Sequence, residues 1–423
     1  MSLKEDYGVI ELDENVLYVR YEIFEDGSAF VYDDPTKSYN SWYLTYDEIY
    51  DELYQTWRNR LKQKHYTHEA FKFERNLGKY LDDLTRQILL RNWKPKGYFD
   101  FLVYHPRRVI SAPFYKDRIV EEWITERFVK PYLEPKLHPS SAACRAEKGP
   151  PLAKAIVLDI LYTAYRKYGL DFYIFQYDMQ SYYDNVSHER IRDIFSGMEA
   201  LGRILFMNIV DDWKKSDSYA AELDSEGSYG VPKGNLPSQW IGLAYLNDLD
   251  WIISEFPGVL GQVRYMDDGL VAFRTKQECL NLKIFIEHYL VDEKMGIALH
   301  PRKTQYFPVS RGFTFCGWRY VLFSDGHIRM REKGERKKIT KSRLKKATED
   351  FFIGKLSEND VRAKLNGIKA YLKAGDTKSF LRYLNHRYVF THDKSKFYKD
   401  RNKEYLKKDW RNKLHERKNC NNR

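Results

Sequence analysis

The sequence predicts an α+β protein built around a split βαβ antiparallel sheet, and three patterns carry this prediction. An apolar, aromatic strand is expected in DFYIFQY, and a strand, a turn and a second strand are expected in RYMDDGLVAF. Short strands follow in GIALHPRKTQYFPVSRGFTFCGWRYV. Two helical segments, SQWIGLAYLNDLDWIISEF and QECLNLKIFIEHYLVDEKM, separate these strands. The order is therefore β-α-β-β-α-β, which is typical of a split βαβ sheet with helices on one face.

The N-terminal part of the chain is expected to form a β-hairpin followed by a helix. Residues 9–33 alternate between apolar and polar side chains around a turn at Glu25-Asp26-Gly27, which is the pattern of a hairpin. Thr45 and Glu48 have the spacing of a capping box, so a helix is expected in TYDEIYDELYQTWRNRLKQ.

The middle of the chain combines helices with irregular segments. Thr67 is expected to begin a second helix that runs to about Arg91. Residues 94–140 look irregular and basic as far as the helical EEWITERFVKPYLEP, and a further helix ends near Gly169. SHERIRDIF has the pattern of a capped helix, and the polar segment from Ser216 is expected to be an exposed loop.

The C-terminal part is helical and basic. Residues 329–346 are dominated by lysine and arginine. A helical pattern continues to about Leu384, and the tail from Lys394 is again basic and aromatic. This charge pattern favours a polyanionic partner. The basic residues would follow the backbone of a duplex and recognise its shape rather than its sequence.

Composition narrows the class of protein. The 423 residues carry a net charge of +11, and 16% of them are aromatic, which suits contacts with nucleic acid. The four cysteines show no CxxC spacing, so neither a zinc knuckle nor a disulfide framework is indicated. The N-terminus lacks an apolar signal core and no stretch is long enough to span a bilayer, so we expect a cytoplasmic protein without a membrane partner.

The adjacent carboxylates of Asp267 and Asp268 are the strongest chemical signal. Two such groups in a tight turn repel each other, and burial would cost several kcal/mol unless a cation compensates. A plain turn, where aspartate is common, is the alternative interpretation. Asp178 stands at the end of another expected strand, and in a split βαβ sheet the two strand ends can lie side by side. Three hard oxygen ligands would then suit a pair of Mg²⁺ ions about 3.5–4 Å apart, the arrangement used for nucleotide polymerisation.

Six sequence blocks strengthen this interpretation because they resemble reverse transcriptases. RRVISAPFYKDRIVEEWI, QYDMQSYYDNVSHERI, GNLPSQ, RYMDDGLVAF, HPRKTQYF and FCGW occur in the order of that family's motifs, over roughly residues 90–320. The resemblance implies a right-hand polymerase, to which this chain adds the N-terminal β-hairpin and helical extension expected above. Its expected parts are an extension at 1–65, fingers at 66–170, a palm with the catalytic aspartates at 171–325, a helical thumb at 326–390 and a basic tail at 391–423.

The resemblance also implies roles for particular residues. The catalytic residues are Asp178, Asp267 and Asp268, and the ligands of two Mg²⁺ ions, for which Mn²⁺ can substitute, are Asp178, Met179, Asp267 and Asp268. Residues expected to bind the incoming nucleotide are Arg108, Lys116, Arg118, Tyr183, Gly234, Gln239 and Lys303. Residues expected to bind primer or template are Gly317, Trp318, Lys337, Lys338, Lys341 and Arg343.

Some of these residues have a structural alternative or depart from the family pattern. Tyr183 stands at the position where an aromatic ring excludes a ribose 2′-hydroxyl, whereas core packing is the alternative for Tyr183 and the preferred reading for its neighbour Tyr182. Ser238 is also suited to cap a helix. Lys233 replaces the glutamine of many members, and the Ser238-Gln239 ending resembles reverse transcriptases of diversity-generating retroelements.

The resemblance therefore predicts an RNA-directed DNA polymerase that makes cDNA from a dedicated structured noncoding RNA and deoxynucleoside triphosphates. Its expected biological role is bacterial antiphage defence, with mutagenic copying in a diversity-generating retroelement as the alternative. A further alternative is a non-catalytic RNA-binding scaffold on the same fold. The N-terminal extension is expected to dock a structured RNA, an accessory protein or another copy of the chain.

Overall fold

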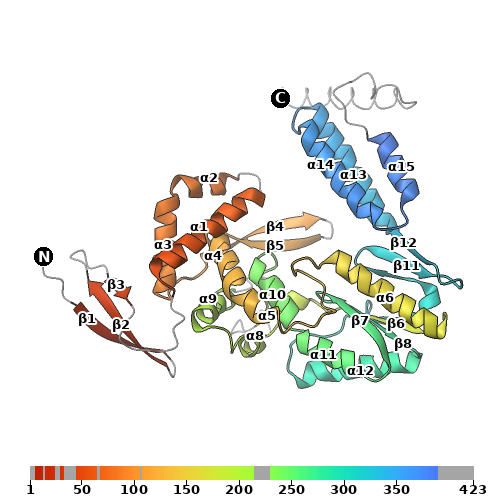
Figure 1. Ribbon diagram of the computed structural model, residues 1–423, viewed down its shortest axis with the longest axis horizontal. Helices are drawn as coiled ribbons and strands as arrows, with labels where there is room; N and C mark the ends of the chain where they lie inside the picture. Colours follow the sequence, from red (N-terminus) through yellow and green to blue (C-terminus); the bar gives the residue numbers. More distant parts are fainter. Residues whose placement is uncertain are drawn as a thin grey trace.

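The computed structural model describes residues 5–12, 15–23, 29–32, 44–63, 67–104, 107–213 and 229–388, which form a mixed protein of helices and antiparallel sheets (Figure 1). The polar segment from Ser216 up to residue 228 and the basic tail expected at 391–423 lie outside the described residues.

The N-terminal strands form a three-stranded antiparallel sheet. Its members are β1 (Glu5–Leu12), β2 (Asn15–Ile23) and β3 (Ala29–Tyr32), in the order β1-β2-β3. The expected hairpin is present as β2 and β3, although its predicted turn lies outside the described residues. The alternating pattern also extends to β1, which pairs with β2 along its whole length and makes the unit larger than predicted.

The first helical unit contains α1 (Tyr46–Gln63), α2 (His68–Arg75) and α3 (Leu77–Leu89). The capping box is confirmed, because the Glu48 carboxylate accepts from the Thr45 N–H at 2.8 Å and the Thr45 hydroxyl accepts from the Glu48 N–H at 3.3 Å. The single helix expected from Thr67 to Arg91 is wrong. It breaks at Asn76, whose non-helical backbone ends α2 and begins α3.

The basic segment after α3 is more regular than predicted. It contains an antiparallel hairpin of β4 (Tyr98–Tyr104) and β5 (Arg107–Pro113), since aromatic and β-branched residues favour strands over irregular structure. The expected helix follows as α4 (Tyr115–Ile124), a π-helical turn (Thr125–Val129) and α5 (Lys130–Leu133).

The central sheet has four antiparallel strands in the order β7-β8-β6-β9. They are β6 (Tyr173–Tyr177), β7 (Val259–Tyr265), β8 (Asp268–Phe273) and β9 (Gln305–Pro308). Helices separate β6 from β7 and β8 from β9, so the predicted β-α-β-β-α-β order and the split βαβ sheet are confirmed.

Both faces of this sheet are covered, which corrects the expectation of helices on one face. On one face Phe175 and Val271 pack with α11 (Asn247–Glu255) and α12 (Lys276–Asp292). On the other, Ile174 and Leu270 pack with α6 (Pro150–Tyr168), which crosses the sheet in Figure 1. The strands are apolar in both phases, as expected for strands buried on two sides.

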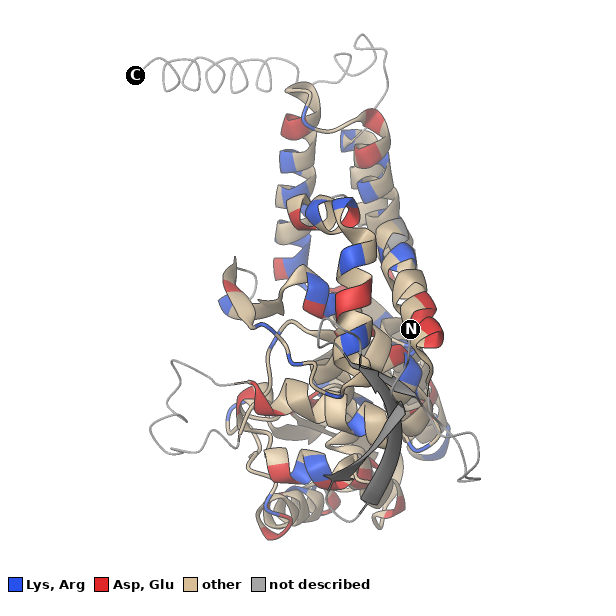
Figure 2. Cartoon of the chain, turned by 90° about the vertical axis from the view of Figure 1, so that its left-hand side faces the viewer, with Lys and Arg blue, Asp and Glu red and all other residues tan. Residues whose placement is uncertain are grey.

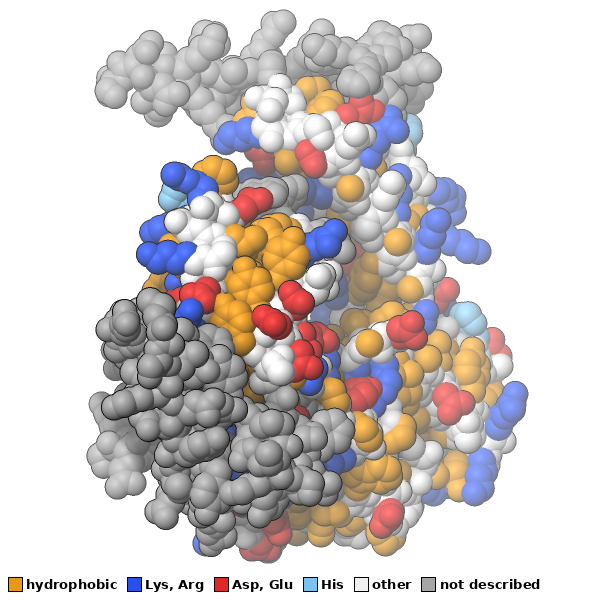
Figure 3. All heavy atoms as spheres, turned by 60° about the vertical axis from the view of Figure 1, so that its left-hand side comes forward, with side chains coloured by type: hydrophobic (Ala, Val, Ile, Leu, Met, Phe, Trp, Pro, Cys, Tyr) orange, Lys and Arg blue, Asp and Glu red, His pale blue; other side chains and the backbone are white. Residues whose placement is uncertain are grey.

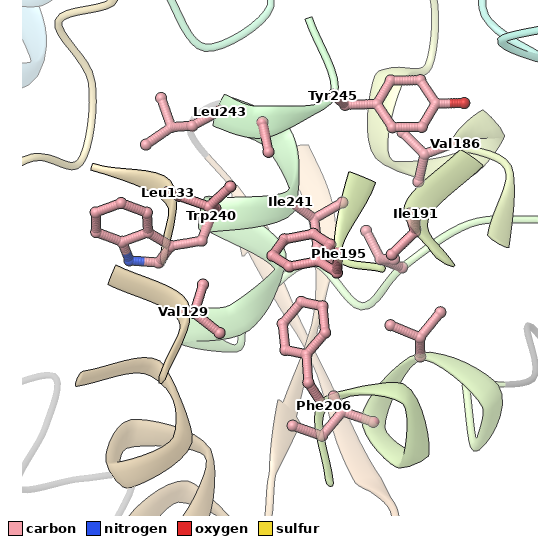
Figure 4. Packing of buried hydrophobic residues seen from close by; sticks show 14 of the residues in the cluster. Val129, Leu133, Val186, Ile191, Phe195, Phe206, Trp240, Ile241, Leu243 and Tyr245 are labelled. Atoms are coloured by element: carbon pink, nitrogen blue, oxygen red, sulfur yellow. The ribbon is translucent and has the colours of Figure 1, made fainter. Parts of the chain in front are cut away.

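Helix α10 (Leu236–Ala244) packs against α4, the π-helical turn and α11 in the larger core, which also includes residues of α7 (Tyr182–Asn185), α8 (His188–Ile194) and α9 (Ala200–Asp211). Figure 4 shows Trp240 on the side of Val129 and Leu133, and Ile241 on the side of Phe195 and Phe206. Tyr177 and Met179, which flank Asp178 in the sequence, belong to the same core.

The helix that contains α10 differs from its prediction in two respects. Its cap is Asn235, whose side chain accepts from the Ser238 N–H at 3.1 Å, so the predicted cap by Ser238 is wrong. The predicted long helix also breaks after Ala244 and resumes as α11. The guanidinium of Arg264 donates to the Leu243 carbonyl at 2.9 Å and thereby satisfies an acceptor at the end of α10.

The C-terminal part contains a second sheet and three helices. The sheet consists of β10 (Phe313–Phe315), β11 (Trp318–Leu322) and β12 (Ile328–Glu332), after a 3₁₀ turn at Val309–Arg311. The helices, α13 (Gly334–Phe352), α14 (Glu358–Lys373) and α15 (Lys378–Arg387), share a small core of their own. Figure 2 shows Lys and Arg positions along these upper helices, with Asp and Glu between them.

Surface properties complete the description of the fold. On the face shown in Figure 3, hydrophobic side chains lie open to solvent among acidic and basic ones. None of the described helices is both long and apolar enough to cross a membrane.

Candidate functional site

The three candidate aspartates lie together at one end of the central sheet. Strand β6 ends at Tyr177, which pairs with Gly269, and Asp178 follows directly. Asp268 is the first residue of β8 and pairs with Tyr265 of β7 across a two-residue turn that contains Asp267. Because β6 and β8 are neighbours in the sheet, Asp178 reaches this turn, and the predicted convergence of the carboxylates is observed.

The turn that carries the adjacent aspartates has an unusual backbone. Met266 has a φ of +57°, a left-handed conformation that costs a non-glycine residue free energy and often accompanies functional sites. Gly269 is required beside it, because a Cβ at that position would lie 2.0 Å from Cζ of the Tyr177 ring. Close packing of Tyr177 under Gly269 therefore allows β6 and β8 to end side by side.

Lys303 supplies a positive charge to the group. Its Nζ donates to both carboxylate oxygens of Asp178 at 2.9 Å. The Lys303 side chain is 58% exposed, whereas that of Asp178 is 9% exposed, so the lysine covers the carboxylate from the solvent side. We predicted Lys303 as a phosphate-binding residue, and the structure places it directly on the first aspartate.

The electrostatics show that one lysine does not balance three carboxylates. Loss of hydration raises the pKa of Asp268, and its hydrogen bond with Asp178 and the charge of Asp267 raise it further. Burial and the charge of Asp178 likewise raise the pKa of Asp267. Desolvation works against the charge of Lys303, but its hydrogen bond with Asp178 leaves the lysine pKa above its usual value. The site therefore favours additional positive charge.

The donor set fits Mg²⁺, although the side chains are not arranged as a ready-made cage. Within the described ranges, no group of three or more His, Cys, Asp or Glu side chains stands in a geometry that would hold a metal ion. Carboxylate oxygens are nevertheless the ligands that Mg²⁺ prefers, and the lysine that donates to both oxygens of Asp178 is exposed. Met179, the fourth predicted ligand, is buried at 2% exposure.

A buried ion pair supports the turn from beneath. Arg264 donates to Asp250 through Nε at 2.8 Å, and both side chains are no more than 2% exposed. Its Nη1 donates to the carbonyl of Met266 at 2.8 Å. Arg264 thus connects the aspartate turn to the start of α11, a role that sequence reasoning missed although the arginine lies inside the motif that carries the aspartates.

Tyr183 lies near the aspartates and is mostly buried. Burial raises the pKa of its hydroxyl, the charge of Asp267 raises it further, and that of Arg108 lowers it, which places both charges within reach of the ring. The ring packs edge-on against Tyr182, with centroids 5.4 Å apart. Tyr182 is a core residue, as predicted, and its hydroxyl donates to the Gly242 carbonyl.

The three predicted cationic residues of the β5–α4 region have different surroundings. Arg108 is exposed on β5, and its charge lowers the pKa of the Tyr183 hydroxyl. Lys116 instead contacts α3, with its Nζ 3.5 Å from Asp83 and 3.7 Å from the centroid of the Tyr80 ring. Arg118 donates to the Pro113 carbonyl at 2.7 Å and is half-buried. Lys116 and Arg118 thus contact other parts of the protein rather than the aspartates.

The predicted nucleotide-binding residues before and within α10 are separated by the helix start. Gly234 lies against β5, where an added Cβ would be 2.7 Å from both the Ser111 carbonyl oxygen and Cγ2 of Ile110. Close backbone approach is therefore the reason for glycine here, although the neighbour is the protein itself. Gln239 is exposed on α10.

The predicted primer-contacting residues surround a tight turn. Cys316 and Gly317 both have positive φ values, 46° and 83°, between β10 and β11. Trp318 is only 3% exposed and stacks on Tyr371 of α14, with ring centroids 4.9 Å apart. The tryptophan ring thus holds α14 against the second sheet, and the Arg336 guanidinium lies close to Gly317 in the turn.

The predicted basic residues of α13 differ in exposure. Lys338, Lys341 and Arg343 are exposed, whereas Lys337 is half-buried. Lys341 lies 4.7 Å from the centroid of the Tyr383 ring of α15, so part of this charge also stabilises the helical unit.

Comparisons with known proteins give limited likeness. No protein-family model matches the chain, and no curated protein matches it. Among solved structures, apo telomerase from Candida tropicalis matches with a TM-score of 0.42 and 14% identity over 71% of this chain and 60% of that one. Telomerase from Candida albicans in complex with a fragment of telomeric RNA matches with a TM-score of 0.38 and 14% identity, over 70% of this chain and 58% of that one. The chain thus spans less than two thirds of either telomerase chain.

Proposed function

We propose that this chain is an RNA-directed DNA polymerase that joins deoxynucleotides by Mg²⁺-dependent nucleotidyl transfer. The observation that supports the proposal is the convergence of Asp178, Asp267 and Asp268 at one end of an antiparallel sheet, in a site with too little positive charge. A non-catalytic RNA scaffold would not need three carboxylates in this arrangement, nor the strained turn that presents two of them.

The chemistry follows from the charges of the residues. The three aspartates would hold two Mg²⁺ ions, which would activate an attacking 3′-hydroxyl and stabilise a leaving pyrophosphate. Lys303 would leave Asp178 as the metal binds and place its ammonium where phosphate charge develops. Arg108 would bind the triphosphate from the β5 side. Tyr183 would exclude a ribose 2′-hydroxyl and thus select deoxynucleotides.

The partners follow from the same proposal. A structured noncoding RNA serves as template, cDNA is the product, and the basic surface of α13 contacts the duplex backbone. A role in antiphage defence and, alternatively, mutagenic copying in a diversity-generating retroelement stay predictions of the sequence.

Primer extension with purified protein tests the proposal. Wild-type protein should incorporate deoxynucleotides on an RNA template with Mg²⁺ or Mn²⁺, and the double variant Asp267→Ala, Asp268→Ala should not. Full activity in that variant, with the fold intact by circular dichroism, would reject the assignment. A folded wild-type protein that binds RNA but never extends a primer would favour the scaffold.

Replacement of Tyr183 tests the sugar gate separately. Tyr183→Ala should admit ribonucleotides while DNA synthesis persists, because the ring that crowds the 2′-position is gone. Unchanged sugar selectivity in an active Tyr183→Ala protein would place the gate at another residue.

A further inference from the structure

A short segment before α10 ties the Tyr183 turn to strand β5. The Val231 N–H donates to the Tyr183 carbonyl at 2.8 Å. Two residues further on, the carbonyl of Lys233 accepts from the Ser111 N–H of β5 at 3.1 Å. This segment is thus a main-chain link between the predicted sugar gate and the strand that carries Arg108.

Two glycines allow this segment to lie close to both neighbours. Gly230 has a φ of +88°, and a Cβ there would lie 3.1 Å from the Asp184 carbonyl oxygen. At the other end, Gly234 lies against Ser111 with no room for a Cβ. The spacing between the Tyr183 turn and β5 is therefore set by close backbone contacts at both ends of the segment.

An ion pair adds a second link between the 230–234 segment and the Tyr183 turn. Nζ of Lys233 lies 2.5 Å from Oδ2 of Asp184, the residue directly after Tyr183. The side chains are 36% and 20% exposed, so the pair is partly shielded from solvent. Asp184 also belongs to the turn through its main chain, since its N–H donates to the Ser181 carbonyl at 2.9 Å.

The ring of Tyr183 is held from a third direction by α10. A Cβ on Gly242 would lie 3.0 Å from the Tyr183 hydroxyl, so the ring tip already rests against the helix backbone. With its tip on α10 and its main chain on the 230–234 segment, the ring can shift only if the turn moves relative to β5. The Lys233–Asp184 pair opposes that movement.

We propose that the ion pair of Lys233 and Asp184 positions Tyr183 and thereby sets how strictly the enzyme rejects ribonucleotides. This inference rests on the proposed function. Lys233 is a positioning residue in this account, because its ammonium is engaged by Asp184 and acts on the substrate through Tyr183. Lys233, which stands where many reverse transcriptases have glutamine, thus helps to fix the position of the Tyr183 ring.

Single-nucleotide extension with matched deoxy- and ribonucleotides tests the proposal. Lys233→Met and Asp184→Asn should each lower the deoxy-to-ribo ratio of kcat/KM by about threefold to tenfold, the effect expected for a partly exposed ion pair. The loss should come from faster ribonucleotide use, with kcat for deoxynucleotides nearly unchanged. The double variant should lose no more than either single variant, because both break one interaction. Lys233→Arg should keep the ratio.

Lys283→Met is the matched control, because it removes a similar partly exposed lysine pair, with Glu287 on α12, at a distance from the gate. Thermal unfolding of each variant shows that the fold is retained. A ratio that stays at the wild-type value in active Asp184→Asn protein overturns the inference. So does a rise in KM for every nucleotide in Lys233→Met alone, which would mean that the lysine contacts substrate directly. An inactive wild type overturns the proposed function itself, which distinguishes that failure from this one.

Discussion

Two groups of charged side chains lie within a few residues of each other on the central sheet, and they are balanced in opposite ways. In the buried group, Asp250 and Arg264 form a 2.6 Å pair, and the remaining guanidinium N–H groups reach backbone carbonyls. In the second group, the exposed Lys303 faces three carboxylates, those of Asp178, Asp267 and Asp268, and Arg264 has a smaller effect on Asp267.

The difference separates structure from chemistry. A buried pair with satisfied hydrogen bonds has no further need for a ligand, and its function is to fix the backbone around it. The carboxylate group has raised pKa values because burial removes its hydration and its charges repel, so a cation lowers its free energy. We therefore expect substitutions in the first group to affect stability and substitutions in the second to affect activity.

The largest expected effect is on catalysis, at Asp178. Asp178→Asn keeps the shape of the side chain but removes a charge that a metal requires. Primer extension should fall by at least about 10³-fold, equivalent to ~4 kcal/mol of transition-state stabilisation. Thermal unfolding should change little, because the neutral amide also relieves repulsion with Asp268. A variant that unfolds instead would show that the two groups do not differ as described.

The second effect is on stability, at Arg264. Arg264→Met leaves the carboxylate of Asp250 buried without a cation and the Met266 carbonyl without its donor. The free energy of unfolding should fall by about 3–5 kcal/mol, measured by urea denaturation.

A paired apolar variant separates stability from activity in this region. Arg264→Met combined with Asp250→Leu removes both charges, so much of the lost stability should return. The Met266 carbonyl still lacks its donor, and polymerase activity should stay low. Full recovery of activity along with stability would show that Arg264 contributes nothing to the position of the aspartate turn.

The sequence predicted the carboxylate group better than the buried pair, for a physical reason. Adjacent aspartates are unusual in an apolar hairpin, so Asp267 and Asp268 can be identified as candidate site residues from the sequence alone. The split βαβ order then brought Asp178 beside them, as the pairing of Tyr177 with Gly269 shows. Asp250, by contrast, looks like an ordinary polar residue of an amphipathic helix, and only the fold shows that it meets Arg264.

Other differences have the same origin in tertiary contacts. The long helix predicted across Ala244 breaks because Arg264 takes up carbonyls at that point. The β4–β5 hairpin was missed because its basic residues obscured an alternation of aromatic and β-branched ones. Trp318 was predicted at a primer contact, yet its ring stacks on Tyr371, a residue 53 positions away that no local pattern connects with it.

A buried carboxylate outside both groups, Glu121, adds a third case to the comparison, because it makes the stability of the protein depend on pH. Glu121 of α4 is 1% exposed, and burial raises its pKa to about 8, while its hydrogen bond with Asn235 acts in the opposite direction. The folded state therefore keeps a proton that the unfolded state loses near pH 4.5. Stability should fall as pH rises from about 4.5 to 8, by up to about 5 kcal/mol in all.

The variant Glu121→Gln isolates this contribution. It should flatten the pH dependence between about pH 6 and 8, above the window in which Asp117, whose pKa burial raises to about 6, contributes. At pH 8 the variant should be more stable than the wild type, measured by denaturant titration. Glu126→Gln, exposed on the next turn, is the control and should leave the slope unchanged. An unaltered slope in Glu121→Gln would show that Glu121 is ionised in the folded protein.

The smallest expected effect returns to the carboxylate group. Although its carboxylate loses some hydration beside Asp178, Asp268 as a residue is exposed, so Asp268→Asn should raise the free energy of unfolding by only about 0.5 kcal/mol in the absence of Mg²⁺, because solvent screens most of the repulsion that it relieves. Added Mg²⁺ should stabilise the wild type through binding to the folded state, and should stabilise Asp268→Asn less, since one ligand charge is gone. Thermal unfolding with and without Mg²⁺ measures both differences. If Mg²⁺ stabilised the two proteins equally, the ion would not be bound by this turn, and the unbalanced charge of the aspartates would need another explanation.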